Sequence, residues 1–381
     1  MTILIYLFKF SLSFIYALLK LFPTNNRKIV FLSRQSNVVS LDFELLRKEL
    51  LKEDKDLKIV ILSKKMTGGL INKLKYYFFL TKQMYHIATS NVCVIDSYII
   101  PISILKHKKS LTIIQMWHAM GAIKKFGYQC LDLDGGHSKI IADKMKMHNN
   151  YDIVISGSDT MIPYFSEAFN TSQSKFKSFG LPRMDYLINQ EKSIKKRIYS
   201  NYPKLKTKES ILYAPTFRKG KSNEIDNLVN EINLNKYNLI IKAHPNKKIK
   251  ITDKRVFVCK EFTSLEMLSI ADYIITDYSA ISIEASVLNK PIYFYLYDYK
   301  EYCNDTGVNI DLYEEMRECV FENAKELYHN IQHIKYDFNK LEMFRDKYVT
   351  TQDGTSTQKI ATLILEELKK WNKINQIKLR N

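Results

Sequence analysis

The 381-residue sequence has few residues that break or cross-link a chain. It contains 11 glycines and 8 prolines, and its five cysteines are widely spaced, with no CxxC pair. This spacing argues against a disulfide framework or a cysteine-based zinc site, and it is typical of a reducing compartment. Because hydrophobic residues make up 46% and charged residues 26% of the chain, we expect a globular protein of two domains or so.

Several signatures of known chemistry are also absent. The sequence has no GxSxG, no GxxxxGK[ST] and no glycine-rich Rossmann fingerprint. No clustered His, Asp and Glu residues indicate a metal site, and Asp132-Leu133-Asp134 is too short a pattern to predict one alone. We therefore expect neither a metal nor a cofactor.

Basic residues outnumber acidic ones, 58 against 40, which gives a formal charge of +18. Such a charge attracts an anionic surface or a phosphorylated ligand. The basic residues are spread along the chain, and no basic-aromatic module such as an RNP motif or a zinc finger is present, so no nucleic-acid partner is expected. Membrane phospholipid and nucleotide-linked substrates remain as candidate partners.

The longest apolar segment lies at the start of the chain, in residues 1–22. Its spaced polar residues recur at intervals of four, three and four, which places them on one side of a helix: Lys9, Ser13, Tyr16 and Lys20. An amphipathic helix of this kind lies in the membrane interface, with lysines at anionic headgroups. A spanning helix and a plain core helix are the alternatives, whereas a signal peptide would need a cleavage site that residues 18–24 do not convincingly offer.

From Arg27 onward, strands alternate with helices. The predicted strands are residues 28–33, 57–62, 92–95, 111–116 and 151–156 in the first half, and 210–214, 239–243, 255–258, 273–276 and 292–296 in the second. The alternation predicts an α/β fold of two domains with parallel sheets, whose ligand loops face a cleft. Residues 187–209 show little apolar periodicity beyond a short helix and are the expected connection, and 357–373 are predicted to form a closing helix.

Residues 271–302 contain a strand, a tight turn, a helix and a second strand, around which the rest is organised. Ser279 is the expected N-cap of a helix over residues 280–288, and the free amides and dipole at that helix start favour a phosphate. A simple helix cap is the alternative. A similar turn at residues 353–356 offers one more anion site, for which a simple helix N-cap is again the alternative.

Two histidines follow predicted strand ends. His118 comes after the strand at 111–116, and His244 comes after 239–243, where Pro245 favours an extended backbone. A histidine at such a position is suited to act as a general base beside an anionic substrate. A hydrogen-bonded structural histidine is the alternative for His118. Arg183 and Arg218 lie in turns that present a guanidinium, which suits phosphate, although each taken singly is more often a surface residue.

Together these stretches resemble the CDP-glycerol glycerophosphotransferase family, whose members build teichoic acids in bacteria. The resemblance rests on eight motifs in order: Trp117-His118 with Lys124-Lys125-Phe126-Gly127, 180–185 (GLPRMD), 213–218 (YAPTFR), 242–245 (KAHP), 275–280 (ITDYSA), Lys290-Pro291-Ile292, Tyr297-Asp298 and Asp353-Gly354. It covers roughly residues 110 to 360. Ala119 stands where many members have glycine, a variant that resembles the priming branch.

The resemblance implies a GT-B arrangement of two Rossmann-like domains with a cleft between them and an N-terminal amphipathic helix. The expected parts are a membrane-interface helix at 1–23, an acceptor domain at 24–190, a CDP-donor domain at 205–356 and a helix at 357–381 that crosses back. It implies His118 as general base, with His244 as second catalytic residue. Implied donor contacts are Arg218, Lys242, Asp277, Ser279, Ala280, Glu284, Thr355 and Ser356, and implied acceptor or phosphate contacts are Lys124, Lys125, Arg183 and Asp185.

The implied reaction transfers glycerol phosphate from CDP-glycerol to a hydroxyl of a polyprenyl-diphosphate-linked disaccharide and releases CMP. The implied enzyme is peripheral, on the cytoplasmic face of the bacterial plasma membrane, where an anionic surface binds it. Alternatives are a CDP-ribitol-using or polymerising relative, and a nucleotide-sugar GT-B glycosyltransferase, against which Pro291 counts because an acidic residue is expected there. A non-catalytic polyanion-binding protein of the envelope is a further alternative.

Overall fold

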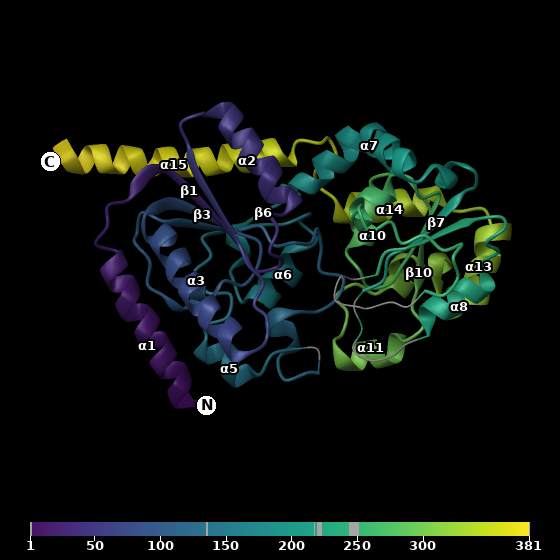
Figure 1. Ribbon diagram of the computed structural model, residues 1–381, viewed down its shortest axis with the longest axis horizontal. Helices are drawn as coiled ribbons and strands as arrows, with labels where there is room; N and C mark the ends of the chain where they lie inside the picture. Colours follow the sequence, from purple (N-terminus) through teal and green to yellow (C-terminus); the bar gives the residue numbers. More distant parts are fainter. Residues whose placement is uncertain (1, 135, 217, 219–222, 244–250, 381) are drawn as a thin grey trace. The chain divides into compact units, whose positions relative to one another are not determined.

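The computed structural model describes residues 2–134, 136–216, 218, 223–243 and 251–380, with side chains as far as Trp371. The chain divides into two compact units (Figure 1). Unit 1 contains residues 1–118, 127–183 and 355–381, and unit 2 contains residues 119–126 and 184–354. Each unit is an α/β domain built on one parallel sheet, as the alternation of strands and helices predicted.

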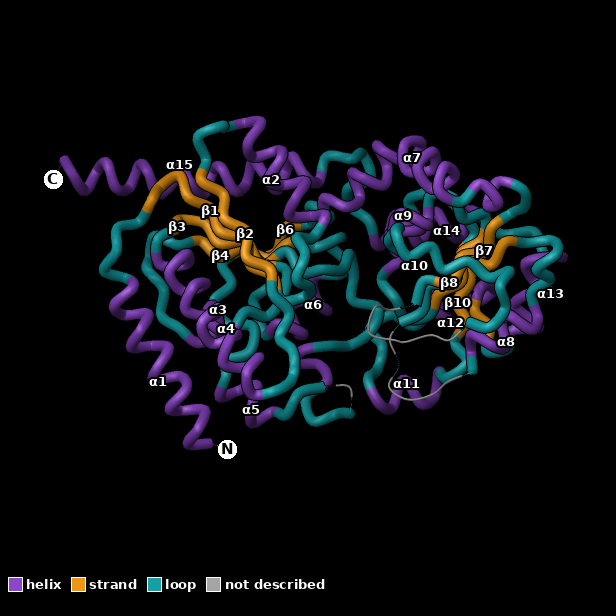
Figure 2. The backbone as a smooth tube through the Cα atoms, viewed as in Figure 1, coloured by secondary structure: helices purple, strands orange, loops and turns teal. Residues whose placement is uncertain are grey.

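Unit 1 has a six-stranded sheet in the order β2-β1-β3-β4-β5-β6 among the described residues (Figure 2). Its strands are β1 (Asn25–Ser33), β2 (Lys58–Ser63), β3 (Ser90–Ile95), β4 (Thr112–Gln115), β5 (Ile153–Ile155) and β6 (Phe176–Lys177). Every residue of β3 and β4 is buried. Strands buried along their whole length are typical of parallel sheets covered on both faces.

The helices of unit 1 flank this sheet. They are α1 (Thr2–Leu19), α2 (Leu41–Glu53), α3 (Leu70–Ala88), α4 (Ile100–Ile104), α5 (Lys139–Lys144), α6 (Ile162–Phe169) and α15 (Ser356–Arg380), with 3₁₀ turns at Gly127–Cys130 and Gln173–Lys175. The closing helix α15 packs on α2, β1 and β3. Two bonds fix it there, because Thr112 Oγ1 donates to Glu367 Oε2 at 2.9 Å and Trp371 Nε1 donates to Thr112 Oγ1 at 3.1 Å.

Unit 2 has a five-stranded parallel sheet in the order β11-β10-β9-β7-β8 among its described residues. Its strands are β7 (Ser210–Tyr213), β8 (Asn238–Ile241), β9 (Tyr273–Thr276), β10 (Ile292–Tyr295) and β11 (Val320–Phe321). The helices are α7 (Pro182–Asn201), α8 (Glu224–Glu231), α9 (Ser264–Leu268), α10 (Ile281–Ser286), α11 (Tyr299–Asp305), α12 (Leu312–Glu315), α13 (Ala324–His333) and α14 (Phe338–Tyr348), with 3₁₀ turns at Pro203–Lys206 and Arg317–Cys319. α7 begins within unit 1.

Three local predictions were wrong. Residues 255–258 form no strand, because Phe257 makes only an isolated bridge to Ile240. The stretch after residue 187 was expected to be mostly irregular but lies largely in α7, whose buried Leu187, Ile194 and Ile198 recur at helical spacing. Finally, α10 begins at Ile281 with Ala280 rather than Ser279 as its N-cap.

Candidate active site

Three parallel strands of unit 1 end level with one another at the edge that carries His118. The register pairs Leu32 with Ile95 across β1 and β3, and Ile95 with Gln115 across β3 and β4. The carboxyl ends of parallel strands meet at one edge of a sheet, where ligand loops gather. The residues beyond those ends are therefore neighbours: Gln35, Asp96 and His118.

His118 is held at its ring nitrogen Nδ1. This atom lies 3.0 Å from the backbone oxygen of Asp96 and 3.1 Å from Gln35 Nε2. The preceding Trp117 has a φ of 60°, and its amide donates to Gln115 Oε1 at 2.8 Å. A positive φ is uncommon for a bulky residue, and backbone outliers of this kind cluster at active sites.

An aromatic cluster supports the His118 ring from behind. The rings of Trp117 and His118 lie 4.2 Å apart, and Trp117 also contacts Phe169 at 5.1 Å and His148 at 5.8 Å. Burial lowers the pKa of His148 to about 3, so this ring is neutral at physiological pH, and its Nδ1 lies 2.8 Å from Tyr151 Oη. The cluster therefore restrains the position of His118 without adding a charge.

A buried carboxyl group lies beneath the same edge. Burial raises the pKa of Asp96 to about 6, although hydrogen bonds with Ser33 and Ser97 oppose the shift. Asp42 raises the pKa further and Arg183 lowers it. Carboxyl groups with pKa values near neutrality concentrate at active sites, although buried structural networks also perturb pKa values.

Arg183, a predicted phosphate contact, is bound to Asp42. Its backbone amide donates to Asp42 Oδ1 at 2.8 Å, its Nε donates to Oδ2 at 2.9 Å, and its Nη2 pairs with Oδ2 as well. These charge-assisted bonds join the start of α7 to the first turn of α2. The observed contacts favour a structural role for Arg183. Asp185 is also buried.

Lys124 and Lys125 follow His118 but group with unit 2. The Lys125 amide donates to Gly307 O at 3.0 Å, and Asn309 N donates to Ile123 O at 2.7 Å. Gly307 has a φ of 80°, and a Cβ there would lie 2.9 Å from Lys125 Cδ, so glycine is needed for this close packing. The backbone of the two lysines is thus fixed, while the Lys124 side chain is exposed.

In unit 2, Asp277 follows β9 and organises the corresponding sheet edge. It is fully buried and accepts from Thr216 N at 2.9 Å and Thr216 Oγ1 at 2.7 Å. Its other oxygen lies 3.0 Å from Arg218 Nη2. Because Thr216 follows β7, this carboxylate ties together the ends of two adjacent strands.

Arg218, a predicted donor contact, is shared between two carboxylates. Its Nε lies 2.5 Å from Asp298 Oδ2, and its guanidinium lies 4.5 Å from the ring centroid of Tyr302, which stacks on Tyr278 at 3.9 Å. Burial alone would lower the pKa of Arg218, but Asp277 and Asp298 hold it above its ordinary value. Nη1 is buried and has no hydrogen-bond partner among the described residues. Arg218 is thus held between two carboxylates and against an aromatic ring.

Lys242, another predicted donor contact, is bound by backbone oxygens. Its Nζ donates to Phe262 O at 2.6 Å, to Cys259 O at 3.0 Å and to Val258 O at 3.2 Å. Burial lowers its pKa below the usual value. Lys242 therefore ties the end of β8 to residues 258–262. His244, the second predicted catalytic residue, lies outside the described residues.

The remaining predicted donor contacts lie at helix starts. Ser279 Oγ is 3.5 Å from Ile281 N, at the limit of a hydrogen bond, whereas Ser279 O accepts from Ser282 Oγ at 3.0 Å. Ala280 is the N-cap of α10, and Glu284 is buried on that helix. At the start of α15, the Thr355 carbonyl accepts from Lys359 N at 3.0 Å, and Ser356 is fully buried.

Sequence reasoning missed Gln35 and the Asp96 carbonyl as partners of His118. The one available signal was that both residues follow predicted strands that end beside the strand before His118. Within the described part of the chain, no group of three or more His, Cys, Asp or Glu side chains is arranged to hold a metal ion.

Two α/β units, each built on a sheet of parallel strands, define a GT-B-type protein, and solved structures share the fold. The wall teichoic acid polymerase TagF superposes with a TM-score of 0.75 at 19% identity, covering 94% of each chain. The UDP-GlcNAc 2-epimerase of Methanocaldococcus jannaschii superposes with a TM-score of 0.55 at 11% identity, covering 89% of this chain and 99% of that one. At these identities the likeness concerns the fold alone.

Residues 14–366 match the family described as CDP-Glycerol:Poly(glycerophosphate) glycerophosphotransferase, and the chain belongs to that family of transferases. A teichoic acid ribitol-phosphate primase of Bacillus spizizenii is 31% identical over 359 residues, covering 90% of this chain and 92% of the relative. A teichoic acid glycerol-phosphate primase of Bacillus subtilis is 31% identical over 298 residues, covering 75% and 76%. A poly(ribitol-phosphate) polymerase of Bacillus spizizenii is 30% identical, and the chain spans 58% of its length.

Proposed function

We propose that the chain transfers a polyol phosphate from a CDP-linked donor to a hydroxyl of a polyprenyl-diphosphate-linked disaccharide and releases CMP. The observation that carries this proposal is the position of His118 at the sheet edge of unit 1, held through Nδ1 and backed by Trp117. A ring held in this way has Nε2 as the nitrogen that takes up a proton. General-base catalysis of this kind contributes about 10²–10⁴-fold to turnover.

In the proposed step, the acceptor O–H gives its proton to Nε2 of His118, and the acceptor oxygen forms a bond to the phosphorus that carries the polyol. The bond between that phosphorus and the bridging oxygen of the diphosphate breaks, and CMP leaves with the bonding electron pair. Charge builds up on the departing phosphate, so cations and backbone amides near it favour the reaction.

For the donor, the proposed contacts are Ser279, Ala280 and Glu284 in unit 2 and Thr355 and Ser356 at the start of α15. The polar backbone of these turns suits a diphosphate and ribose hydroxyls. Lys124 and Lys125 are proposed to meet a phosphate of the acceptor or donor, because their backbone is fixed while the Lys124 side chain remains exposed.

Glycerol is the first donor polyol of the proposal, and ribitol is the second. The family description and the Bacillus subtilis primase support CDP-glycerol. The ribitol-phosphate primase matches a larger share of the chain at the same identity, which supports CDP-ribitol. Priming, meaning a single addition, is proposed because both of these relatives are primases.

We propose that the enzyme acts as a peripheral protein on the cytoplasmic face of the plasma membrane. Among the described residues, α1 is the one helix long and apolar enough to cross a membrane. However, Leu12 and Tyr16 are buried against unit 1, and Tyr16 Oη lies 2.9 Å from His107 Nδ1. A helix held to the fold along one face is better suited to lie in the interface than to span the bilayer.

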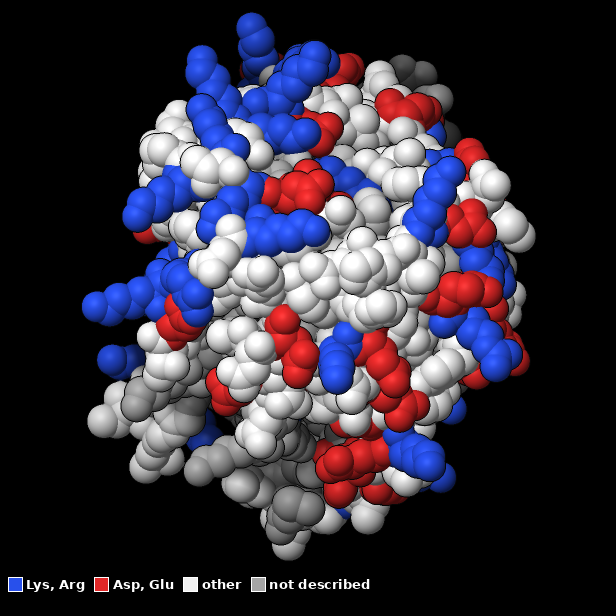
Figure 3. All heavy atoms as spheres, turned by 90° about the vertical axis from the view of Figure 1, so that its right-hand side faces the viewer, with Lys and Arg blue, Asp and Glu red and all other residues white. Residues whose placement is uncertain are grey.

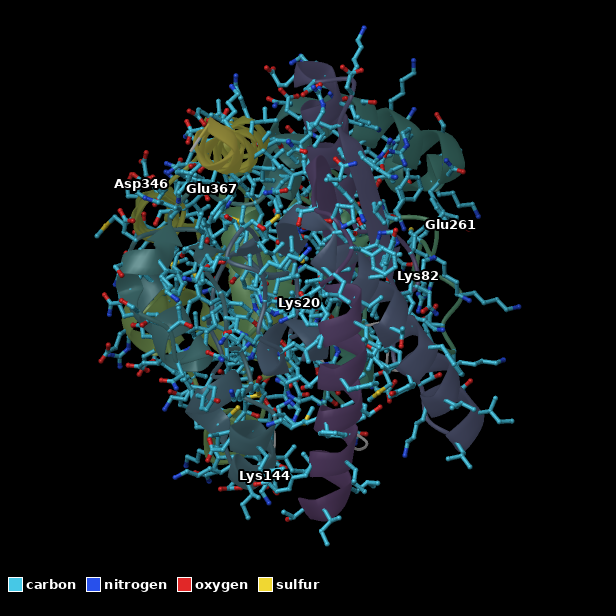
Figure 4. The ribbon with its side chains drawn as sticks, turned by 90° about the vertical axis from the view of Figure 1, so that its left-hand side faces the viewer. Lys20, Lys82, Lys144, Glu261, Asp346 and Glu367 are labelled. Atoms are coloured by element: carbon cyan, nitrogen blue, oxygen red, sulfur yellow. The ribbon has the colours of Figure 1, made fainter. Side chains whose placement is uncertain are left out.

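The opposite face of α1 is apolar and exposed, and the exposed surface continues onto α3, which lies beside it (Figure 4). The exposed side chains are Ile3, Leu4, Leu7, Phe10, Phe14 and Leu18 on α1 and Leu70, Ile71, Leu74 and Phe78 on α3. Neither helix contains an acidic residue, Lys82 lies on α3, Lys20 directly follows α1, and Lys144 Nζ donates to Thr2 Oγ1 at the start of α1. By contrast, the face drawn in Figure 3 mixes acidic with basic residues. An anionic leaflet complements the α1–α3 surface.

The direct test is CMP release from CDP-glycerol and from CDP-ribitol, each with a short-chain lipid-diphosphate disaccharide, followed by mass spectrometry of the product. CMP together with one added glycerol phosphate is the expected result. A ladder of products or a ribitol adduct would assign the chain to the polymerising or ribitol-using alternative. No CMP from either donor would contradict the proposal.

A further inference from the structure

Gln35 follows β1, which lies two positions from β4, the strand before His118, in the order of the sheet. Gln35 lies beyond the end of β1, Asp96 beyond β3 and His118 beyond β4, and these three strands are neighbours in the sheet. The Gln35 amide and the Asp96 carbonyl approach the same ring atom, Nδ1, at 3.1 Å and 3.0 Å. Both contacts lie within unit 1.

The chemistry of these groups selects one form of the ring. A backbone carbonyl only accepts hydrogen bonds, so the contact with Asp96 O places a hydrogen on Nδ1. In the neutral ring, the lone pair then resides on Nε2. The Gln35 Nε2–H group cannot bond to a protonated Nδ1, because both are donors. Rotating the Gln35 side-chain amide by 180° exchanges Nε2 for Oε1, and Oε1 then accepts the hydrogen of Nδ1. The hydrogen on Nδ1 is then shared between two oxygens.

We propose that Gln35 is a positioning residue that, with the Asp96 carbonyl, fixes His118 as the Nδ1-protonated tautomer and stabilises its imidazolium. This inference rests on the proposed function of His118 as general base. When Nε2 takes the acceptor's proton, the ring becomes positive, and two oxygens at Nδ1–H favour that charged form. Gln35 thereby makes His118 a stronger base without carrying a charge itself.

The ionisable groups around the His118 ring have partners of their own or are neutral, so the effect of Gln35 on the His118 titration can be measured. His148, behind Trp117, is neutral because its pKa is lowered to about 3, chiefly by burial and in smaller part by His137, Arg34 and His118. The Arg34 guanidinium donates to Tyr98 O at 3.0 Å and lies over the Tyr98 ring. The Asp96 carboxyl is engaged by Ser33 and Ser97. Nδ1 itself contacts Asp96 O and Gln35 Nε2.

The test replaces Gln35 and follows His118 directly by nitrogen NMR of the full-length protein labelled in its histidine rings. His118 is assigned by its absence in His118→Asn. In the wild type we expect the chemical shifts of the Nδ1-protonated tautomer. Gln35→Glu places a carboxylate at Nδ1 and should move the midpoint of the His118 titration about one pH unit higher, whereas Gln35→Leu should move it about half a unit lower.

The matched control is Gln173→Glu. Gln173 is exposed in the same unit and precedes β6, so it lies at the opposite edge of the parallel sheet. This control adds the same charge and should leave the His118 titration unchanged. An Nε2-protonated ring in the wild type, or a midpoint that is the same in all Gln35 variants, would overturn the role of Gln35.

The pH dependence of CMP release separates this inference from the proposed function. If His118 is the base, the acid limb of the kcat profile should follow the NMR midpoint upward in Gln35→Glu and downward in Gln35→Leu. A midpoint that moves while the kcat profile stays in place would support the role of Gln35 at His118 and contradict His118 as the base.

Discussion

The carboxyl edges of the two sheets treat their polar residues differently. In unit 1, the edge holds His118 at Nδ1 and leaves the ring half-exposed beside Trp117. In unit 2, the cationic side chains at the corresponding edge bind groups within the same unit. Arg218 pairs with Asp277 and Asp298, and Lys242 donates to three backbone carbonyls. The unit 1 edge carries the proposed general base, whereas the cations described at the unit 2 edge bind groups within their own unit.

This difference shows that residue type and strand-end position do not alone identify a ligand contact. Arginine and lysine at strand ends suit phosphate, but they also satisfy buried carboxylates and carbonyl groups. Asp277→Ala and Lys242→Met distinguish the two uses, because loss of a ligand contact changes binding, whereas loss of an internal contact changes stability.

The largest effect is expected for Asp277→Ala in unit 2. This change leaves the Arg218 guanidinium and the Thr216 amide without their shared buried acceptor, and breaking a buried pair costs about 3–5 kcal/mol. Urea denaturation measures the free energy of unfolding. The control is Asp253→Ala, which removes an exposed pair with Arg255 and should cost under about 1 kcal/mol. Equal losses in the two variants would contradict a structural role for the unit 2 edge.

Asp96→Asn tests the unit 1 edge through pH. The pKa of Asp96 is raised to about 6 from 3.8, so the folded state binds more protons between these values and stability falls as pH rises through that window. From pH 4 to pH 7 the wild type should lose about 2–3 kcal/mol more than Asp96→Asn. Parallel pH profiles for the two proteins would show that this carboxyl is not strained by burial.

Lys242→Met distinguishes a structural tie from a donor contact. Removing the ammonium group leaves three carbonyls without their donor, so the free energy of unfolding should fall by about 2 kcal/mol. The Michaelis constant for the CDP-polyol should change little in the protein that remains folded. A large rise in that constant with unchanged stability would instead assign Lys242 to the donor's phosphates.

The smallest effect is expected at the surface of unit 1. Phe78→Ser on α3 removes one exposed ring from the proposed membrane surface and should weaken binding to anionic vesicles about tenfold. Met343→Ser on α14 is the control, because Met343 is equally exposed but belongs to unit 2. Equal vesicle binding by both variants and the wild type would remove α3 from the membrane surface.

The fold was largely predictable because parallel strands leave unbroken apolar runs. Nine of the ten predicted strands correspond to strands in the structure, and residues 255–258 are the exception. The two-residue strands β6 and β11 were missed, since they are too short to show a period. α7 was underestimated because its apolar residues are separated by long runs of charged and polar residues.

The site was less predictable. His118 is recognisable because a histidine follows a buried strand, but its partners Gln35 and Asp96 come from loops far away in sequence. A contact made through a backbone carbonyl leaves no trace in residue type. For the same reason, nothing in the sequence shows that Lys242 donates to the carbonyls of residues 258, 259 and 262.

The most direct test of the account is turnover of His118→Ala, measured as CMP release in the presence of the lipid-linked acceptor. The account predicts a fall in kcat of about 10²–10⁴-fold, with an unchanged melting temperature and unchanged stabilisation by the CDP-polyol. His329→Ala, which removes an exposed histidine on α13, should keep full activity. Turnover of His118→Ala within about threefold of the wild type would contradict His118 as the general base.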